Sequence, residues 1–109
     1  MTTITTLREL AKALNRATDS PQTAWERLDG HPVANVGHWY IDAYQPGGNR
    51  HIYNVARICS TGGGQDFPLG SARMTAGECA RVLRAVLDVA WAVHENQWTA
   101  EGYAGRFTR

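Results

Sequence analysis

Apolar side chains recur at helical spacing near both ends of the chain and alternate with polar ones in its middle. The first helical pattern covers residues 6–18, "TLRELAKALNRAT". Thr6 followed by Glu9 has the spacing of a capping box, so Thr6 is the expected N-cap. One face of this helix is apolar: Ile4, Leu7, Leu10, Leu14 and Ala17. The pattern predicts an amphipathic helix that covers a core with one face.

A second, shorter helix is predicted over "SPQTAWERLDG", residues 20–30. Ser20 can cap it, and Pro21 has the fixed φ that suits the first helical position. Trp25 and Leu28 would share a face, and Gly30 would end the helix after about two turns. Residues 31–37 then read as a connector.

The segments "HWYIDAY" (38–44) and "HIYNVARIC" (51–59) predict two antiparallel strands, because both are rich in aromatic and β-branched residues. A loop with an even number of residues between them would place Tyr44 opposite His51 and Trp39 opposite Ala56. An odd number would reverse the faces of one strand. The even register is preferred because it separates apolar from polar side chains better.

In that register one face of the hairpin is a core face, with Asn54 as its only polar member. It carries Trp39, Ile41, Ala43, Ile52, Ala56 and Ile58. Trp39 is expected to be the residue most costly to truncate. The other face is expected to meet water and carries His38, Tyr40, Asp42, Tyr44, His51, Tyr53, Val55 and Arg57.

The glycines at 62–64 predict a mobile connection rather than an anion site, because no cation or helix start follows them. Residues 66–74 could add a short third strand, at an edge because Pro68 lacks an amide hydrogen. The strongest pattern follows over 74–96, where Thr75 and Glu78 form a second capping box.

This long helix has a broad apolar face: Cys79, Val82, Leu83, Val86, Leu87, Val89, Ala90 and Val93. Trp91 falls on its polar stripe. We interpret Trp91 as covered by the C-terminal tail through Trp98 or Tyr103. The alternative is that it belongs to a homodimer or partner surface.

These elements predict a single α+β domain over 1–109, with a small antiparallel sheet of two or three strands packed on a long C-terminal helix. N-terminal helices occupy 1–30, the hairpin and edge strand 36–70, the long helix 75–95 and the tail 96–109. With 109 residues, 43% hydrophobic, the chain can bury a core without staples. A formal charge of +1 argues against a protein that wraps nucleic acid and against an acidic DNA mimic.

No catalytic, cofactor or metal motif is present in the sequence. The single lysine, Lys12, lies in no phosphate-loop pattern, and Phe67 occupies the position of the third glycine of a dinucleotide motif. The histidines and the cysteines Cys59 and Cys79 do not fall at zinc spacing, and two reduced thiols are expected. We therefore expect no enzyme, no cofactor and no metal. No signal peptide or membrane span is indicated, so a cytoplasmic location is expected.

The aromatic and basic strand face is the expected binding surface. Tyr and Arg are enriched in protein interfaces, and stacked aromatics with donors also bind single-stranded nucleic acid. A protein partner is favoured over nucleic acid; the tyrosines could also simply suit a strand or lie under the N-terminal helices. The expected partner-binding residues are His38, Tyr40, Tyr44, His51, Tyr53, Arg57 and Trp91.

The order of two strands, a glycine-rich connection and the helix "TAGECARVLRAVLDVAWAVHE" resembles that of small phage-encoded anti-CRISPR inhibitors, over residues 38–95 and in layout only. The resemblance implies a binder that blocks a host defence complex in the host cytoplasm. Many such inhibitors are acidic mimics of nucleic acid, which this chain is not. A double-stranded-RNA-binding domain has a similar order, but its second helix opens with lysines where this chain has "TAGE".

Overall fold

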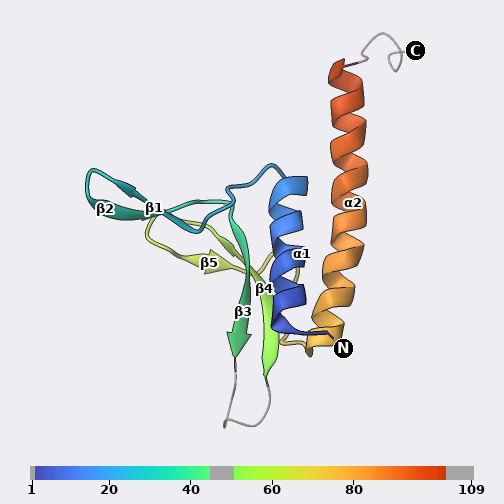
Figure 1. The fold of residues 1–109 in the computed structure, drawn as a ribbon, viewed down its shortest axis with the longest axis horizontal. Coiled ribbons are helices and arrows are strands. Elements are labelled where there is room, and N and C mark those ends of the chain that lie inside the picture. The colour runs from blue at the N-terminus through green and yellow to red at the C-terminus, as the bar shows by residue number, and fades with distance from the viewer. Residues whose placement is uncertain (1, 45–50, 103–109) are drawn as a thin grey trace.

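The computed structural model describes residues 2–44 and 51–102, and their side chains up to residue 93. The fold is α+β, as predicted, with two helices and two small antiparallel sheets in the described residues (Figure 1). The elements are α1 (Ile4–Ala17), β1 (Trp25–Leu28), β2 (His31–Ala34), β3 (Trp39–Tyr44), β4 (Ile52–Ile58), β5 (Gln65–Asp66) and α2 (Ala76–Gly102).

The first helix is confirmed, but its N-cap is Thr3 rather than Thr6. The Thr3 hydroxyl accepts a hydrogen bond from the Thr6 amide at 3.3 Å. The earlier start adds Ile4 to the helix, where it packs against the core cluster. Both threonines suit a cap, and burial of Ile4 favours the longer helix.

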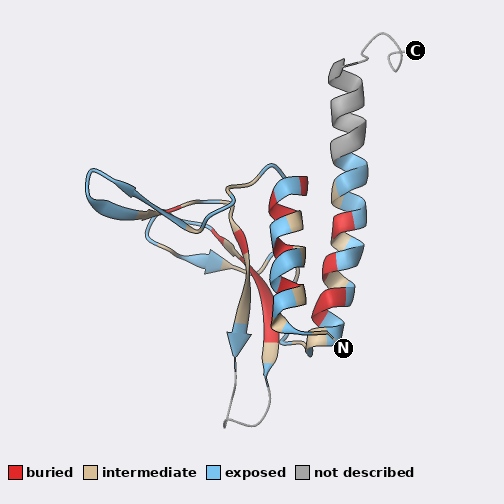
Figure 2. Ribbon diagram, in the orientation of Figure 1, coloured by how far each residue is buried: buried red, intermediate tan, exposed pale blue. Residues whose placement is uncertain are grey.

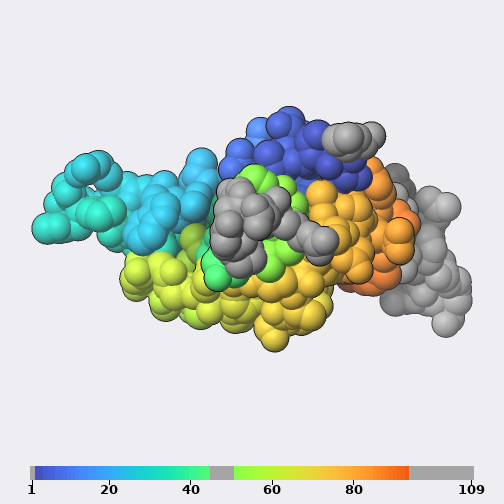
Figure 3. Space-filling model, turned by 90° about the horizontal axis from the view of Figure 1, so that it is seen from below, coloured from blue at the N-terminus to red at the C-terminus, as the bar shows by residue number. Residues whose placement is uncertain are grey.

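The second predicted helix is wrong: residues 25–34 form the hairpin of β1 and β2. Leu28 pairs with His31, so Asp29 and Gly30 make a two-residue turn. Their φ angles are 53° and 80°, the doubly positive conformation of the turn that matches the twist of a hairpin. This Asp-Gly signal for a hairpin outweighs the weak helical spacing of Trp25 and Leu28. The hairpin projects from the body of the molecule (Figure 3).

The second sheet has the order β3-β4-β5, which confirms the predicted hairpin and the presence of a short edge strand, although that strand is 65–66 and ends before Pro68. Its register differs by one residue from the predicted one: Trp39 pairs with Arg57 and Tyr44 pairs with Ile52. The connection therefore contains an odd number of residues between paired positions, and the faces of β4 are reversed. Tyr53 and Val55 join Trp39 and Ile41 on the helix-facing side, while Ile52, Asn54, Ala56 and Ile58 lie on the other.

The predicted rule of one dry and one wet sheet face fails on β4, because that strand is buried on both sides. Tyr53 and Val55 are buried on one side, Asn54 and Ala56 on the other. The even register was preferred because it kept apolar β4 side chains away from water. With both sides of β4 buried, neither set of its side chains has to face water, so that preference disappears. Figure 2 shows β4 as the buried centre of the sheet.

The long helix α2 begins with the predicted capping box. The Thr75 amide donates to the Glu78 carboxylate at 2.9 Å, and the Glu78 amide donates to the Thr75 hydroxyl at 3.3 Å. The helix continues to Gly102, beyond the predicted end at 95. Its first half packs on α1 and β4 through Cys79, Leu83 and Leu87, and its second half extends past the end of α1 (Figure 1).

The connection between β4 and β5 was expected to be mobile but is closed by hydrogen bonds. The Cys59 amide donates to the Gly64 carbonyl at 2.8 Å, and the Gly64 amide donates to the Ser60 hydroxyl at 2.9 Å. Gly63 has a φ of +94°, and a Cβ there would lie 2.9 Å from two ring carbons of Trp25. Glycine is therefore required at 63 by its backbone conformation and by the ring that lies over it.

Candidate functional site: a groove between α1 and the free edge of β3

The β3–β4 register places the expected binding residues on different faces of the sheet, so they do not form one continuous surface. Tyr53 is buried in the core cluster, so it cannot contact a partner in this fold. Arg57 lies on the opposite sheet face from Tyr40 and Tyr44, where it pairs with Asp66 at 3.0 Å and covers the Trp39 ring at 5.5 Å. The expectation that three tyrosines and Arg57 share one exposed face was therefore wrong.

The other expected binding residues lie in four separate places. His38 and Tyr40 are neighbours at the start of β3, with ring centroids 6.3 Å apart. Tyr44 lies under the guanidinium of Arg73 at 4.6 Å. His51 is exposed beside the Tyr53 ring, and Trp91 is 40% exposed on α2. The tail residues Trp98 and Tyr103, expected to cover Trp91, lie outside the side chains that the structure describes.

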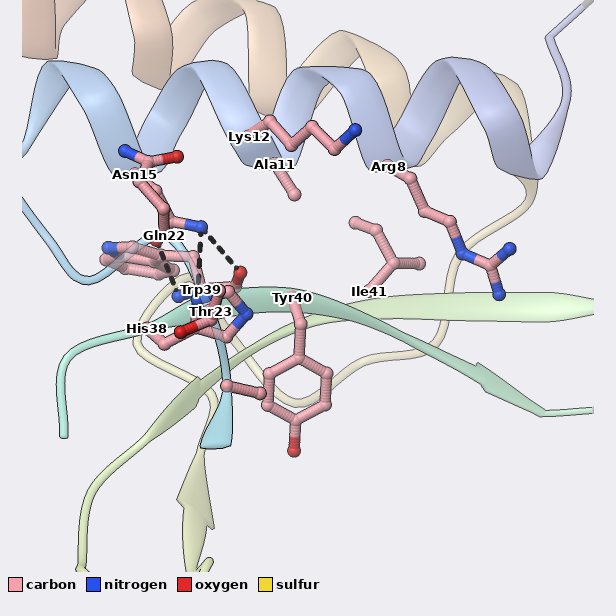
Figure 4. Close-up of a pocket in the computed structure, with 11 residues that line it drawn as sticks. Arg8, Ala11, Lys12, Asn15, Gln22, Thr23, His38, Trp39, Tyr40 and Ile41 are labelled. Carbon is pink, nitrogen blue, oxygen red and sulfur yellow. Dashed lines mark hydrogen bonds between the residues drawn. The ribbon is translucent and has the colours of Figure 1, made fainter. Parts of the chain in front are cut away.

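His38 and Tyr40 line a groove of about 420 Å³ between α1 and β3. One wall is the outer side of α1, the floor is the beginning of β3, and residues 22–24 close one end (Figure 4). The lining residues are Arg8, Ala11, Lys12, Asn15, Gln22, Thr23, Ala24, His38, Trp39, Tyr40 and Ile41.

The floor of the groove is the edge of β3 that does not pair with β4. Asn15 occupies the first position of this edge: its amide nitrogen donates to the Trp39 carbonyl at 3.0 Å, and its oxygen accepts the Trp39 amide at 2.8 Å. Backbone groups of an antiparallel strand alternate between its two neighbours, so those of Ile41 and Ala43 also point to this edge. Among the described residues, none donates to or accepts from these outward groups.

The α1 wall of the groove is positively charged. Arg8 makes no ion pair with any described residue, and Lys12 pairs with Glu9 at 3.4 Å in an exposed position. Such an exposed pair contributes little free energy, so Lys12 can turn to a ligand at small cost. Figure 4 shows Arg8 and Lys12 along the helix above Ile41 and the β3 floor.

The polar residues at the closed end of the groove are already oriented. His38 Nδ1 lies 2.8 Å from the Pro21 carbonyl oxygen, which requires a proton on Nδ1 and leaves Nε2 as the acceptor in the neutral ring. The Tyr40 hydroxyl donates to Gln65. Partial burial, with the nearby Asp42 and Cys59 charges, raises the pKa of Tyr40, so its hydroxyl stays a donor at neutral pH.

No cluster of metal-ligating side chains accompanies the groove in the described part of the chain. No three His, Cys, Asp or Glu side chains there gather closely enough to hold a metal ion. Cys59 is exposed and Cys79 is buried, each as a free thiol, and burial raises the pKa of Cys79 to about 11. A thiol with so high a pKa is a poor nucleophile.

No family model, curated protein or solved structure matches this chain. Within residues 2–44 and 51–102, no helix is both long and apolar enough to cross a bilayer.

Asn15, Arg8 and Lys12 were not expected from the sequence as parts of a site. A signal for Asn15 was present, because it lies four residues after Ala11 and so interrupts the apolar face of α1. A buried amide on such a face needs backbone partners, and these come from a strand edge more than twenty residues away in sequence.

Proposed function

We propose that this protein is a non-enzymatic binding module that takes an extended, acidic segment of a partner protein along the free edge of β3. The observation that carries the proposal is the pairing of Asn15 with Trp39. It shows that this edge accepts an amide with both donor and acceptor, and no described residue bonds to the next outward groups, at Ile41.

Strand addition uses backbone hydrogen bonds for affinity and neighbouring side chains for specificity. Here Arg8 and Lys12 stand on the helical wall above the edge. A carboxylate on the added segment would form charge-assisted hydrogen bonds with them. The groove therefore favours an extended segment that carries Asp or Glu at alternate positions, because alternate side chains of a strand point to the same side.

A protein partner is favoured over single-stranded nucleic acid because the aromatic platform is incomplete. Tyr53 is in the core and Arg57 is on the other face. Tyr40 and Tyr44 are engaged by Gln65 and Arg73. Base stacking needs free aromatic faces along a continuous path, whereas strand addition needs only the backbone edge and one charged wall.

The partner class implied by the resemblance to anti-CRISPR inhibitors is a host defence complex such as a CRISPR effector. Its support is the order of β3, β4, the glycine connection and α2. We propose a host defence complex as the first partner class to test. The test expresses the protein in bacteria with an active CRISPR system and counts phage plaques. Plaques restored to the level of a strain without the system support the class, and unchanged protection removes it.

The groove itself is tested with a labelled peptide of alternating valine and glutamate, measured by fluorescence anisotropy and amide NMR. We expect binding, with the Ile41 and Ala43 amides shifted and protected from exchange. Arg8→Glu with Lys12→Glu should weaken binding by at least about tenfold, since two charge-assisted contacts are lost. The matched control, Arg81→Glu with Arg84→Glu, changes the charge equally on α2 and should not.

Three outcomes oppose the proposal. One is no binding of the peptide, and another is equal binding by the Arg8/Lys12 variant. The third is tighter binding of a single-stranded oligonucleotide that is lost in that variant and falls steeply with salt, which would assign the groove to nucleic acid. A peptide with the same sequence but methylated backbone nitrogens should not bind, because it cannot form the strand ladder.

A further inference from the structure

A stripe of valines on α2 forms the outer edge of its apolar face, next to the side that faces the core, and one of its members, Val86, still packs against the core cluster. The stripe consists of Val82, Val86, Val89 and Val93, here called the valine seam. These positions repeat with spacings of four, three and four, so at about 100° per residue they lie within an arc of roughly 60°. The core-facing residues Leu83 and Leu87 lie about 110° around the helix from the centre of this arc.

The valine seam becomes more exposed along the helix. Val82 and Val86 are partly buried, while Val89 is 64% and Val93 58% exposed. Beside the seam is an apolar hollow of about 340 Å³ lined by Ala85, Val86, Val89 and Ala90. A helix of a monomeric protein needs apolar positions only toward its core, and Val89 and Val93 lie beyond the positions that α2 buries there.

We infer that the valine seam is the contact of a homodimer, in which α2 of one copy packs antiparallel against α2 of a second. The spacing of four, three and four reads the same in both directions. A twofold axis at its centre therefore places Val82 opposite Val93 of the second copy and Val86 opposite Val89. Such self-complementarity is what an isologous contact between identical chains requires.

The residues around the seam are also compatible with packing against the same seam of a second copy. Spacings of three and four with β-branched residues are typical of knobs-into-holes packing between two helices. The hollow between Ala85 and Ala90 is a hole, and the seam supplies valine knobs. Ala85 and Ala92 on the solvent side are small, which permits close approach. Glu78 and the cations Arg81 and Arg84 lie outside the arc, so the contact buries no charge within it.

The contact is small, which sets the strength to expect. A seam of four valines per copy buries less than the roughly 800 Å² per partner of a standard interface. The dimer should therefore be concentration-dependent, with a dissociation constant on the order of 10 to 100 µM. The inference is independent of the groove, since the seam and the β3 edge lie on different elements.

The test is sedimentation equilibrium of the full chain over concentrations that bracket this value. We expect a monomer-dimer equilibrium that Val89→Glu weakens by at least about tenfold. Arg84→Glu, about 170° from the seam centre, is the control and should leave it unchanged. Circular dichroism should show the same helix content in all three. A monomer at every concentration, or equal association of the Val89→Glu variant, overturns the inference.

Two further arms identify the occupant and its direction. In a Cys59→Ser background, a mixture of Val86→Cys and Val89→Cys chains should oxidise mainly to the mixed dimer; mainly self-linked dimers would overturn the antiparallel arrangement. If the full chain is monomeric and a chain ending at 102 dimerises, the last seven residues, 103–109, occupy the seam and the second copy does not.

Discussion

The side-chain amide of Asn15 pairs with both backbone polar groups of Trp39, at 3.0 and 2.8 Å, and so connects the last turn of α1 to the first residue of β3. Asn15 is 1% exposed. Because both bonds are buried, the pair satisfies a strand edge that would otherwise have needed water or a partner strand.

Asn15→Ala is expected to lower the free energy of unfolding by about 2 to 3 kcal/mol, because it leaves the Trp39 amide and carbonyl buried without partners. Urea unfolding followed by circular dichroism measures the change. Arg16→Ala is the matched control: it is the exposed neighbour on the same turn and should cost little. Equal midpoints for the two variants would show that the Asn15 bonds contribute no net stability.

Gly63→Ala is expected to destabilise the protein by about 1 to 3 kcal/mol, because its φ of +94° strains an L-residue and its Cβ would press on Trp25. Gly62→Ala in the same loop meets no atom within 4 Å and is the control. Tryptophan fluorescence should change only for Gly63→Ala, because the Trp25 ring must move. An identical effect of both substitutions would contradict the close contact between Gly63 and Trp25.

Tyr53→Ala is expected to cost about 3 kcal/mol or more, because it opens a cavity in the core. Tyr44→Ala should cost much less, since Tyr44 is 49% exposed. Chemical denaturation of both variants compares them directly. This pair also tests the strand register, because the even register would turn Tyr53 outward like Tyr44 and make the two costs similar.

Cys79 should make stability fall at alkaline pH. Its folded pKa of about 11 lies above the ordinary value of 9.0 that the thiol regains on unfolding. Between these values the unfolded state binds fewer protons than the folded one, so the free energy of unfolding falls as pH rises, by about 2 to 3 kcal/mol in all. Below about pH 8 this contribution does not change.

Unfolding of the wild type and Cys79→Ala at several pH values measures this, because the difference between them isolates the thiol. We expect Cys79→Ala to be less stable at neutral pH and to lose less stability above pH 9. A thiol reagent should modify the exposed Cys59 at once and Cys79 only on unfolding. Parallel pH curves, or two thiols that react equally fast in the folded protein, would contradict the burial of Cys79.

The candidate site was predicted only in part because its components depend on which elements meet. His38 and Tyr40 were expected from the composition of their strand, and both line the groove. Arg8 and Lys12 looked like an ordinary solvated face of α1. They line the groove only because α1 packs beside β3, a contact between residues far apart in sequence.

The sequence alone determined where α1, β3, β4 and α2 form, because the signals for these elements are local. Periodic apolar positions and the Thr75–Glu78 capping box act within a few residues, so they do not depend on the rest of the fold. The Asp29-Gly30 turn is an equally local signal, but the helical spacing of Trp25 and Leu28 led to the prediction of a helix there. Tertiary structure alone decided the β3–β4 register, because burial of β4 on both faces removes the alternation by which a sequence marks its inner side. It also decided that no described residue pairs with the edge of β3 beyond Trp39, since a strand edge belongs to the arrangement of the sheet and to no residue by itself.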